Sequence, residues 1–170
     1  MARFGQVLTA MVSPFDDAGA IDLDGARVLA KWLVANGNDG IVVAGTTGEG
    51  PTLSYDEHID LVSAVVEAVD VPVIAGAGSN DTRAAVELAR RATGVGASGI
   101  LAVTPYYNRP SQAGIVAHFR AVASATDLPI MLYDIPVRTG RKVATENLIE
   151  LSRVDNIVAL KDAAGNPGAT

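Results

Sequence analysis

The sequence contains no cysteine. This absence excludes disulfide bonds, thiolate metal sites and a thiol nucleophile. Basic residues are also scarce, with 13 lysines and arginines against 19 aspartates and glutamates, which gives a formal net charge of −6. A chain with this balance lacks the basic surface that nucleic acids and anionic membranes bind. We therefore expect small molecules as its partners, with no nucleic acid and no membrane.

Long apolar runs are absent as well. No stretch approaches the roughly 18 residues of a membrane-spanning helix, and the N-terminus lacks the apolar segment of a signal peptide. We therefore expect a cytoplasmic protein. Hydrophobic residues make up 49% of the 170 residues and charged residues 19%, which is typical of a globular chain. This length is enough for one core, and we predict a single domain over residues 1–170.

Short apolar runs alternate with helical patterns along the whole chain. The predicted strands are 6–12, 40–44, 72–75, 99–103, 129–133 and 157–160, and the predicted helices are 25–35, 55–69, 82–92, 112–125 and 145–153. The strand ends recur every 28 to 33 residues, and a (β/α)8 barrel uses about 31 residues per unit. A doubly wound open sheet would favour a phosphate loop after the first strand, where the chain has Ser13–Pro14–Phe15–Asp16. We predict an α/β fold, a (β/α)8 TIM barrel of which this chain supplies about six βα units.

Several residues are predicted to begin or end these helices. Asp22 and Asp24 charge or cap the helix 25–35, and Asn36–Gly37 ends it. Ser54 and Glu57 have the spacing of a capping box, and Thr145 is predicted to cap the helix that follows it.

Lys161 directly follows the apolar run 157–160. Burial at the end of such a strand disfavours the ammonium form, and only the neutral amine attacks a carbonyl carbon to form a Schiff base. The alternative is a lysine that leaves the sheet and points to water. Tyr133 ends the preceding strand, so in a parallel barrel it lies about 4.8 Å away and is able to exchange protons with an adduct on the lysine. Alternation places Ile157 and Ala159 on the same face as Lys161.

Other polar clusters also follow strands directly. They are Thr46–Thr47, Asn80 and Tyr106–Tyr107. In a barrel, all of these converge on the C-terminal face, where active sites are built. The positions taken together favour a catalytic Lys161 over a solvated one.

Four motifs carry a resemblance to a known family. They are Gly45–Thr46–Thr47–Gly48–Glu49, Thr104–Pro105–Tyr106–Tyr107–Asn108, Tyr133 with Pro136 and Arg138–Thr139–Gly140, and Lys161. Together they resemble the dihydrodipicolinate synthase family over the whole chain. The resemblance implies a Schiff base between Lys161 and pyruvate, with no metal and no further cofactor. The enamine then adds to aspartate-4-semialdehyde, giving 4-hydroxy-tetrahydrodipicolinate in lysine biosynthesis.

The resemblance also implies roles for single residues. Thr46, Tyr107 and Tyr133 form a proton relay, with Tyr107 reaching into the neighbouring subunit of a homodimer or homotetramer. Thr47 holds the pyruvate carboxylate, and Arg138 holds the carboxylate of the semialdehyde. Two positions depart from the family pattern without being expected to touch the chemistry. Asp134 stands where the family often has asparagine, and Val137 where it often has glycine.

The two histidines, His58 and His118, match no catalytic role and are interpreted as ordinary helix residues. Six units account for the chain, so it looks like the N-terminal part of a longer enzyme. The last two strands and the C-terminal helical region are absent, and we expect little activity from the chain alone. Two alternatives stay open. One is a sister pyruvate-dependent aldolase that cleaves N-acetylneuraminate or a 2-keto-3-deoxy sugar acid, and the other is a non-catalytic half-barrel. Arg138 and the Tyr106–Tyr107 pair favour the synthase.

Overall fold

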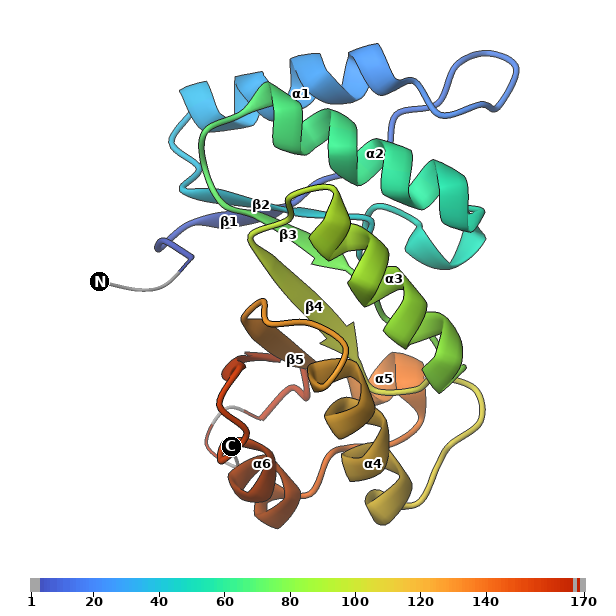
Figure 1. Ribbon diagram of the computed structural model, residues 1–170, viewed down its shortest axis with the longest axis vertical. Coiled ribbons are helices and arrows are strands. Elements are labelled where there is room, and N and C mark those ends of the chain that lie inside the picture. Colours follow the sequence, from blue (N-terminus) through green and yellow to red (C-terminus); the bar gives the residue numbers. More distant parts are fainter. Residues whose placement is uncertain (1–3, 167, 169–170) are drawn as a thin grey trace. The chain divides into compact units, whose positions relative to one another are not determined.

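A computed structural model describes residues 4–166 and 168 (Figure 1). Strands and helices alternate as the sequence predicts. The strands are β1 (Leu8–Ala10), β2 (Gly40–Val43), β3 (Val73–Gly76), β4 (Gly99–Val103), β5 (Ile130–Asp134) and β6 (Ile157–Asp162). The helices are α1 (Leu23–Ala35), α2 (Tyr55–Ala68), α3 (Thr82–Gly94), α4 (Gln112–Ala123), α5 (Pro136–Thr139) and α6 (Thr145–Leu151), with a short 3-10 helix at Gly50–Thr52. In the part of the chain that is described, no helix is long and apolar enough to cross a membrane.

The chain forms two compact units. The first contains residues 1–76 and 91–99, and the second contains residues 77–90 and 100–170. The single domain predicted over residues 1–170 stays a prediction.

The first unit contains three parallel strands in the order β1, β2, β3 (Figure 1). Every residue of β2 and β3 is buried, because their runs are apolar on both faces. Helices α1 and α2 lie side by side, and an ion pair of 3.6 Å joins Arg27 to Glu67 across them. β1 is shorter than the predicted strand 6–12, because it contains only three residues, all of which pair with β2.

The predicted capping residues Asp22, Asn36, Ser54 and Glu57 of the first unit are confirmed. The Asp22 carboxylate accepts a hydrogen bond of 2.8 Å from the Gly25 amide, so α1 starts at Leu23, two residues earlier than predicted. Asn36 ends that helix. Ser54 and Glu57 make both bonds of the capping box at the start of α2. Local side chains are sufficient to set these ends, which explains why the sequence alone revealed them.

The second unit contains the parallel strands β4, β5 and β6. Tyr133 is the register partner of Val103 on one side and of Lys161 on the other. Helices α4 and α6 pack together, joined by an ion pair of 2.9 Å between Arg120 and Glu150. The largest fully buried side chains of this unit are those of Ile100, Ile115, Phe119, Ile130 and Leu151.

The prediction that Thr145 caps α6 is wrong. The residue that precedes the helix is Ala144, whose side chain makes no capping bond, and Thr145 is the first helical residue. The first turn is held instead from α4, because the Gln112 side-chain oxygen accepts from the Ala144 amide at 3.0 Å and from the Asn147 side chain at 2.7 Å. A cap supplied 32 residues away in the sequence leaves no local signal.

The prediction that Ile157 shares a face with Lys161 is also wrong. Between the pairs Ile130–Ile157 and Met131–Ala159 the register shifts by one residue, which is a β-bulge. The extra residue is Val158. Ala159 and Lys161 therefore lie beside Met131 and Tyr133, whereas Ile157 lies on the opposite face.

Asn156 closes the connection between α4 and β5. Its side-chain amide donates to three carbonyl oxygens, those of Ala123, Thr126 and Leu128, at 3.0, 2.9 and 3.3 Å. Its own carbonyl accepts from the Ile130 amide at 2.7 Å. We expect Asn156→Asp to lower the free energy of unfolding by about 1–3 kcal/mol, because the carboxylate has no hydrogen to donate to these carbonyls.

Chemical denaturation followed by circular dichroism measures this change. Asn166→Asp, at an exposed position, is the matched control and should shift the free energy by no more than about 0.5 kcal/mol. An unfolding midpoint for Asn156→Asp equal to that of the control would show that the three contacts do not stabilise the fold.

Candidate active site

Lys161 and Tyr133 form a close pair at the ends of β6 and β5. The Lys161 Nζ lies 4.3 Å from the centroid of the Tyr133 ring. Tyr133 is only 5% exposed and Lys161 is half-buried. Burial lowers the pKa of the Lys161 amine, because a low-dielectric environment disfavours the ammonium form. The predicted juxtaposition is confirmed, and burial shifts the amine toward the neutral form, which is the nucleophilic one.

Thr104 fixes the backbone of Tyr133. Its amide donates to the Tyr133 carbonyl at 3.1 Å and its hydroxyl donates to the same oxygen at 3.3 Å. Thr104 is fully buried. Sequence reasoning placed it inside a motif without a role, although a hydroxyl residue directly after a buried strand is a signal that could have identified it.

Thr46 and Thr47 lie in the first unit, on the loop that follows β2. The loop is closed by amide bonds from Glu49 to Thr46 and from Gly50 to Gly45, at 3.2 and 3.1 Å. Both threonine side chains are exposed. At Gly50 an added Cβ would lie 2.3 Å from the Ala44 carbonyl oxygen, so only glycine permits this close approach of the backbone.

His58 supports the same loop, a role that sequence reasoning missed. Its ring is 4% exposed, and Nε2 donates to the Gly76 carbonyl oxygen at 2.5 Å. The ring also bonds to the backbone of Gly50. Burial lowers the pKa of His58, and its hydrogen bonds to the backbone act in the opposite direction. The imidazole thus ties the threonine loop to the end of β3.

His118 is buried on α4 in the second unit. Its Nδ1 lies 2.9 Å from the Thr82 hydroxyl, and Nε2 has no partner among the described residues. Burial lowers the pKa of His118 to about 4. This ring remains neutral over the physiological range and contacts Phe119 edge-on, as a packing residue of the helix does.

Tyr107 and Arg109 have unusual backbone conformations, with φ angles of +67° and +50°. Tyr107 is 88% exposed. Its loop is joined to the one after β3, because the Asn108 side chain donates to the Asn80 carbonyl at 2.9 Å. Non-glycine residues with positive φ are strained and concentrate at functional sites. The geometry therefore presents Tyr107 outward from the second unit.

Arg138 lies on α5, within the segment 134–140 that was predicted to be a loop without helix. Its side chain is exposed. Thr46 and Thr47 belong to the first unit, and Tyr107, Tyr133, Arg138 and Lys161 belong to the second. The structure brings Tyr133 and Lys161 into contact, and the convergence of all six residues stays a prediction.

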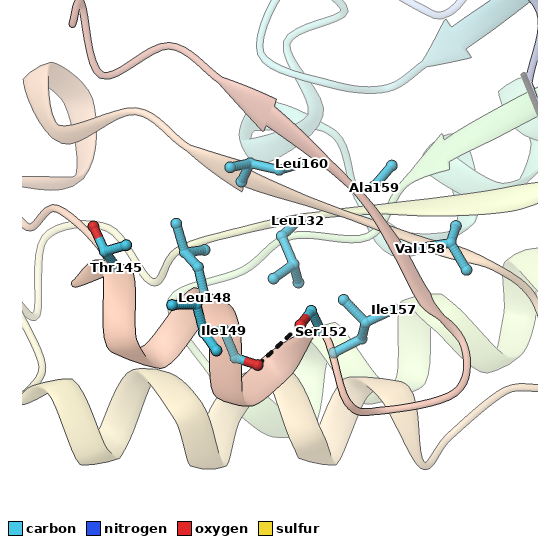
Figure 2. A pocket seen from close by; sticks show the side chains of 9 residues that line it. All are labelled: Leu132, Thr145, Leu148, Ile149, Ser152, Ile157, Val158, Ala159 and Leu160. Carbon is cyan, nitrogen blue, oxygen red and sulfur yellow. Dashed lines mark hydrogen bonds between the residues drawn. The ribbon is translucent and has the colours of Figure 1, made fainter. Parts of the chain in front are cut away.

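A pocket of about 440 Å³ lies between α6 and the last two strands (Figure 2). Its lining consists of Leu132, Thr145, Leu148, Ile149, Ser152, Ile157, Val158, Ala159 and Leu160. None of these side chains is ionisable, so the pocket offers no acid, base or amine. Within residues 4–166 and 168, no three histidine or carboxylate side chains gather as a metal site would require.

Comparison with known proteins gives a consistent result. The chain matches the Dihydrodipicolinate synthetase family over residues 3–169. It is 57% identical to 4-hydroxy-tetrahydrodipicolinate synthase from Acidothermus cellulolyticus, covering 97% of this chain and 54% of the relative. It is 58% identical to the protein of the same name from Cutibacterium acnes, covering 95% and 56%. The chain spans about half the length of the curated relatives it matches.

The crystal structure of DHDPS from Cyanidioschyzon merolae with lysine bound has a TM-score of 0.96 and 49% identity, covering 98% of this chain and 58% of that one. The fold prediction is confirmed, because the chain supplies six parallel strands of a (β/α)8 barrel, the first five each followed by a helix in the described residues, and the barrel is incomplete within it.

The lowered pKa of Lys161 predicts its chemical reactivity. We expect acetic anhydride to acetylate Lys161 at lower pH than Lys31, which is exposed on α1, because more of the Lys161 amine is neutral there. Brief labelling over a pH series followed by peptide mass spectrometry compares both lysines in one sample. If the two labelling curves coincide, burial does not activate Lys161.

Proposed function

Because the chain belongs to the dihydrodipicolinate synthetase family, we propose that it supplies the catalytic lysine of a 4-hydroxy-tetrahydrodipicolinate synthase. The substrates are pyruvate and aspartate-4-semialdehyde. The observation that carries the proposal is the half-buried Lys161 amine, which lies 4.3 Å from the Tyr133 ring at the ends of adjacent strands. The name shared by the relatives from Acidothermus and Cutibacterium favours the synthase over a sister aldolase.

The chemistry begins with the neutral Lys161 amine. Its lone pair attacks the keto carbon of pyruvate, and loss of water from the carbinolamine leaves an imine. Loss of a methyl proton converts the imine into an enamine, whose carbon adds to the aldehyde of the second substrate. The aldehyde oxygen takes up a proton and becomes a hydroxyl group. The amino group of the semialdehyde then attacks the imine carbon, and this ring closure displaces the Lys161 amine and releases the product. None of these steps requires a metal or a further cofactor.

Proton transfers are assigned to three hydroxyl groups, those of Tyr133, Thr46 and Tyr107. Tyr133 is assigned the role of general acid and base. The proximity of its ring to the Lys161 amine and the bonds from Thr104 to its backbone support this assignment. Thr46 and Tyr107 complete the relay. The 88% exposure of Tyr107 supports its insertion into the site of a second copy, and thus a homodimer or homotetramer.

Carboxylate recognition is assigned to two other residues. Thr47 holds the pyruvate carboxylate through its hydroxyl and the amides of the loop. Arg138 holds the semialdehyde carboxylate, because a guanidinium binds a carboxylate bidentately. Both side chains are exposed in the structure and free to meet a ligand.

Borohydride trapping tests the covalent step. Residues 1–166 are joined to the C-terminal part of the Acidothermus relative so that the barrel is complete, and the chimera is incubated with pyruvate and borohydride. We expect a single adduct on Lys161, located by mass spectrometry, and no adduct in Lys161→Arg. Trapping on Lys31 or Lys142, or adducts that persist in the variant, would refute the role of Lys161.

Substrate selection is tested at Arg138. In the same chimera, Arg138→Ala should lower the rate of condensation tenfold to a hundredfold while leaving pyruvate trapping unchanged, because it removes one charge-assisted pair of about 1.5–3 kcal/mol. Arg141→Ala is the matched control, because Arg141 is exposed on the same segment. Equal losses in both assays would mean that Arg138 supports the fold and does not select the second substrate.

A further inference from the structure

We propose that Asp134 is a positioning residue for Arg138. Its buried carboxylate closes the base of the loop 135–143, which carries the arginine. The role of Arg138 in binding a carboxylate rests on the proposed function, whereas the closure of the loop does not. Sequence reasoning assigned Asp134 no part in the chemistry.

The closure is made where β5 ends. Asp134 is the last residue of β5 and is 2% exposed. Its two carboxylate oxygens lie 3.4 and 3.3 Å from the amide nitrogen of Val143, which is itself 1% exposed. The loop thus begins directly after Asp134, and its last residue, Val143, bonds back to the Asp134 side chain. Without Asp134 the buried Val143 amide would lose its acceptor, a state that folded proteins avoid.

The same residue connects the loop to the strand of the reactive lysine. The Asp134 carbonyl accepts from the Ala163 amide at 2.9 Å, directly beyond β6. Asp134 also faces Asp162 in the register of β5 and β6. The base of the Arg138 loop is therefore fixed to the strand end that holds Lys161.

Inside the loop a second closure is present. The Thr139 hydroxyl lies 2.9 Å from the Arg141 carbonyl oxygen and 3.2 Å from that of Ile135. Gly140 ends α5 with a φ of +71°, a conformation that glycine adopts without strain. Loops whose ends meet and whose interior packs on itself are compact units. Arg138 is thus exposed at a defined place, because the two closures leave its backbone little freedom.

Charge also links the loop to its base. The loop contains three cations, Arg138, Arg141 and Lys142, and no acidic residue. Burial raises the pKa of Asp134, and the negative charge of Asp162 raises it further. The hydrogen bond from the Val143 amide and the positive charge of Lys142 lower it. An asparagine at this position would keep an oxygen that accepts from Val143 without the cost of a buried charge. An alanine would remove the accepting oxygen together with the charge.

Hydrogen exchange tests the closure without reference to activity. In Asp134→Ala we expect the amides of residues 137–143 to exchange about tenfold faster or more, with α4 unchanged, because a buried bond is lost. Asp134→Asn and the exposed control Asp155→Ala should exchange as the wild type does. If Asp134→Ala does not fold, Asp134→Leu, which removes the acceptor and leaves less of a cavity, takes its place. Unchanged exchange in the folded variant would overturn the closure.

Kinetics of the completed chimera test the positioning. In Asp134→Ala we expect the KM for the semialdehyde to rise about tenfold, with pyruvate trapping on Lys161 unchanged and the KM restored in Asp134→Asn. Faster exchange of the loop amides together with an unchanged KM for the semialdehyde would overturn the positioning role. If the wild-type chimera condensed no substrate at all, the proposed function would fail. The exchange data would still decide whether Asp134 closes the loop.

Discussion

The pairing of β5 with β6 is the constraint on which the reactive site depends. It brings the Lys161 amine against the Tyr133 ring and removes much of the amine from water. An ammonium group in that environment loses hydration, and contact with the ring face returns only part of it. The strand end therefore holds a lysine whose pKa is lowered by burial, so the site has a chemical property that its position in the sequence does not state.

The β-bulge at Val158 makes this arrangement compatible with a packed core. Strict alternation would place Ile157 on the face of Lys161, and one apolar side chain would then be lost from the side of α6. The extra residue turns Ile157 toward α6, where it lines the apolar pocket with Leu148 (Figure 2). The strand thus presents apolar side chains to the helix and a lysine to Tyr133.

Loops that carry the remaining site residues are held by polar groups that do not themselves react. His58 binds the backbone at Gly76 beside the threonine loop, and Thr104 binds the carbonyl of Tyr133. Asp134 does the same for the loop of Arg138. In each case a buried side chain on a helix or strand, or directly next to one, makes a hydrogen bond to a backbone group. Short polar loops are therefore kept in one conformation.

The sequence by itself determined the order of strands and helices, the caps at Asp22 and Ser54, and the juxtaposition of Tyr133 with Lys161. These features follow from apolar periodicity and from side chains that act within a few residues. Only the tertiary structure decided the cap that Gln112 provides for α6, the bulge in β6 and the bond between Asp134 and Val143. Their partners are distant in sequence or depend on how two strands align. No local pattern records such pairings, because the energy that selects them arises only when the segments meet.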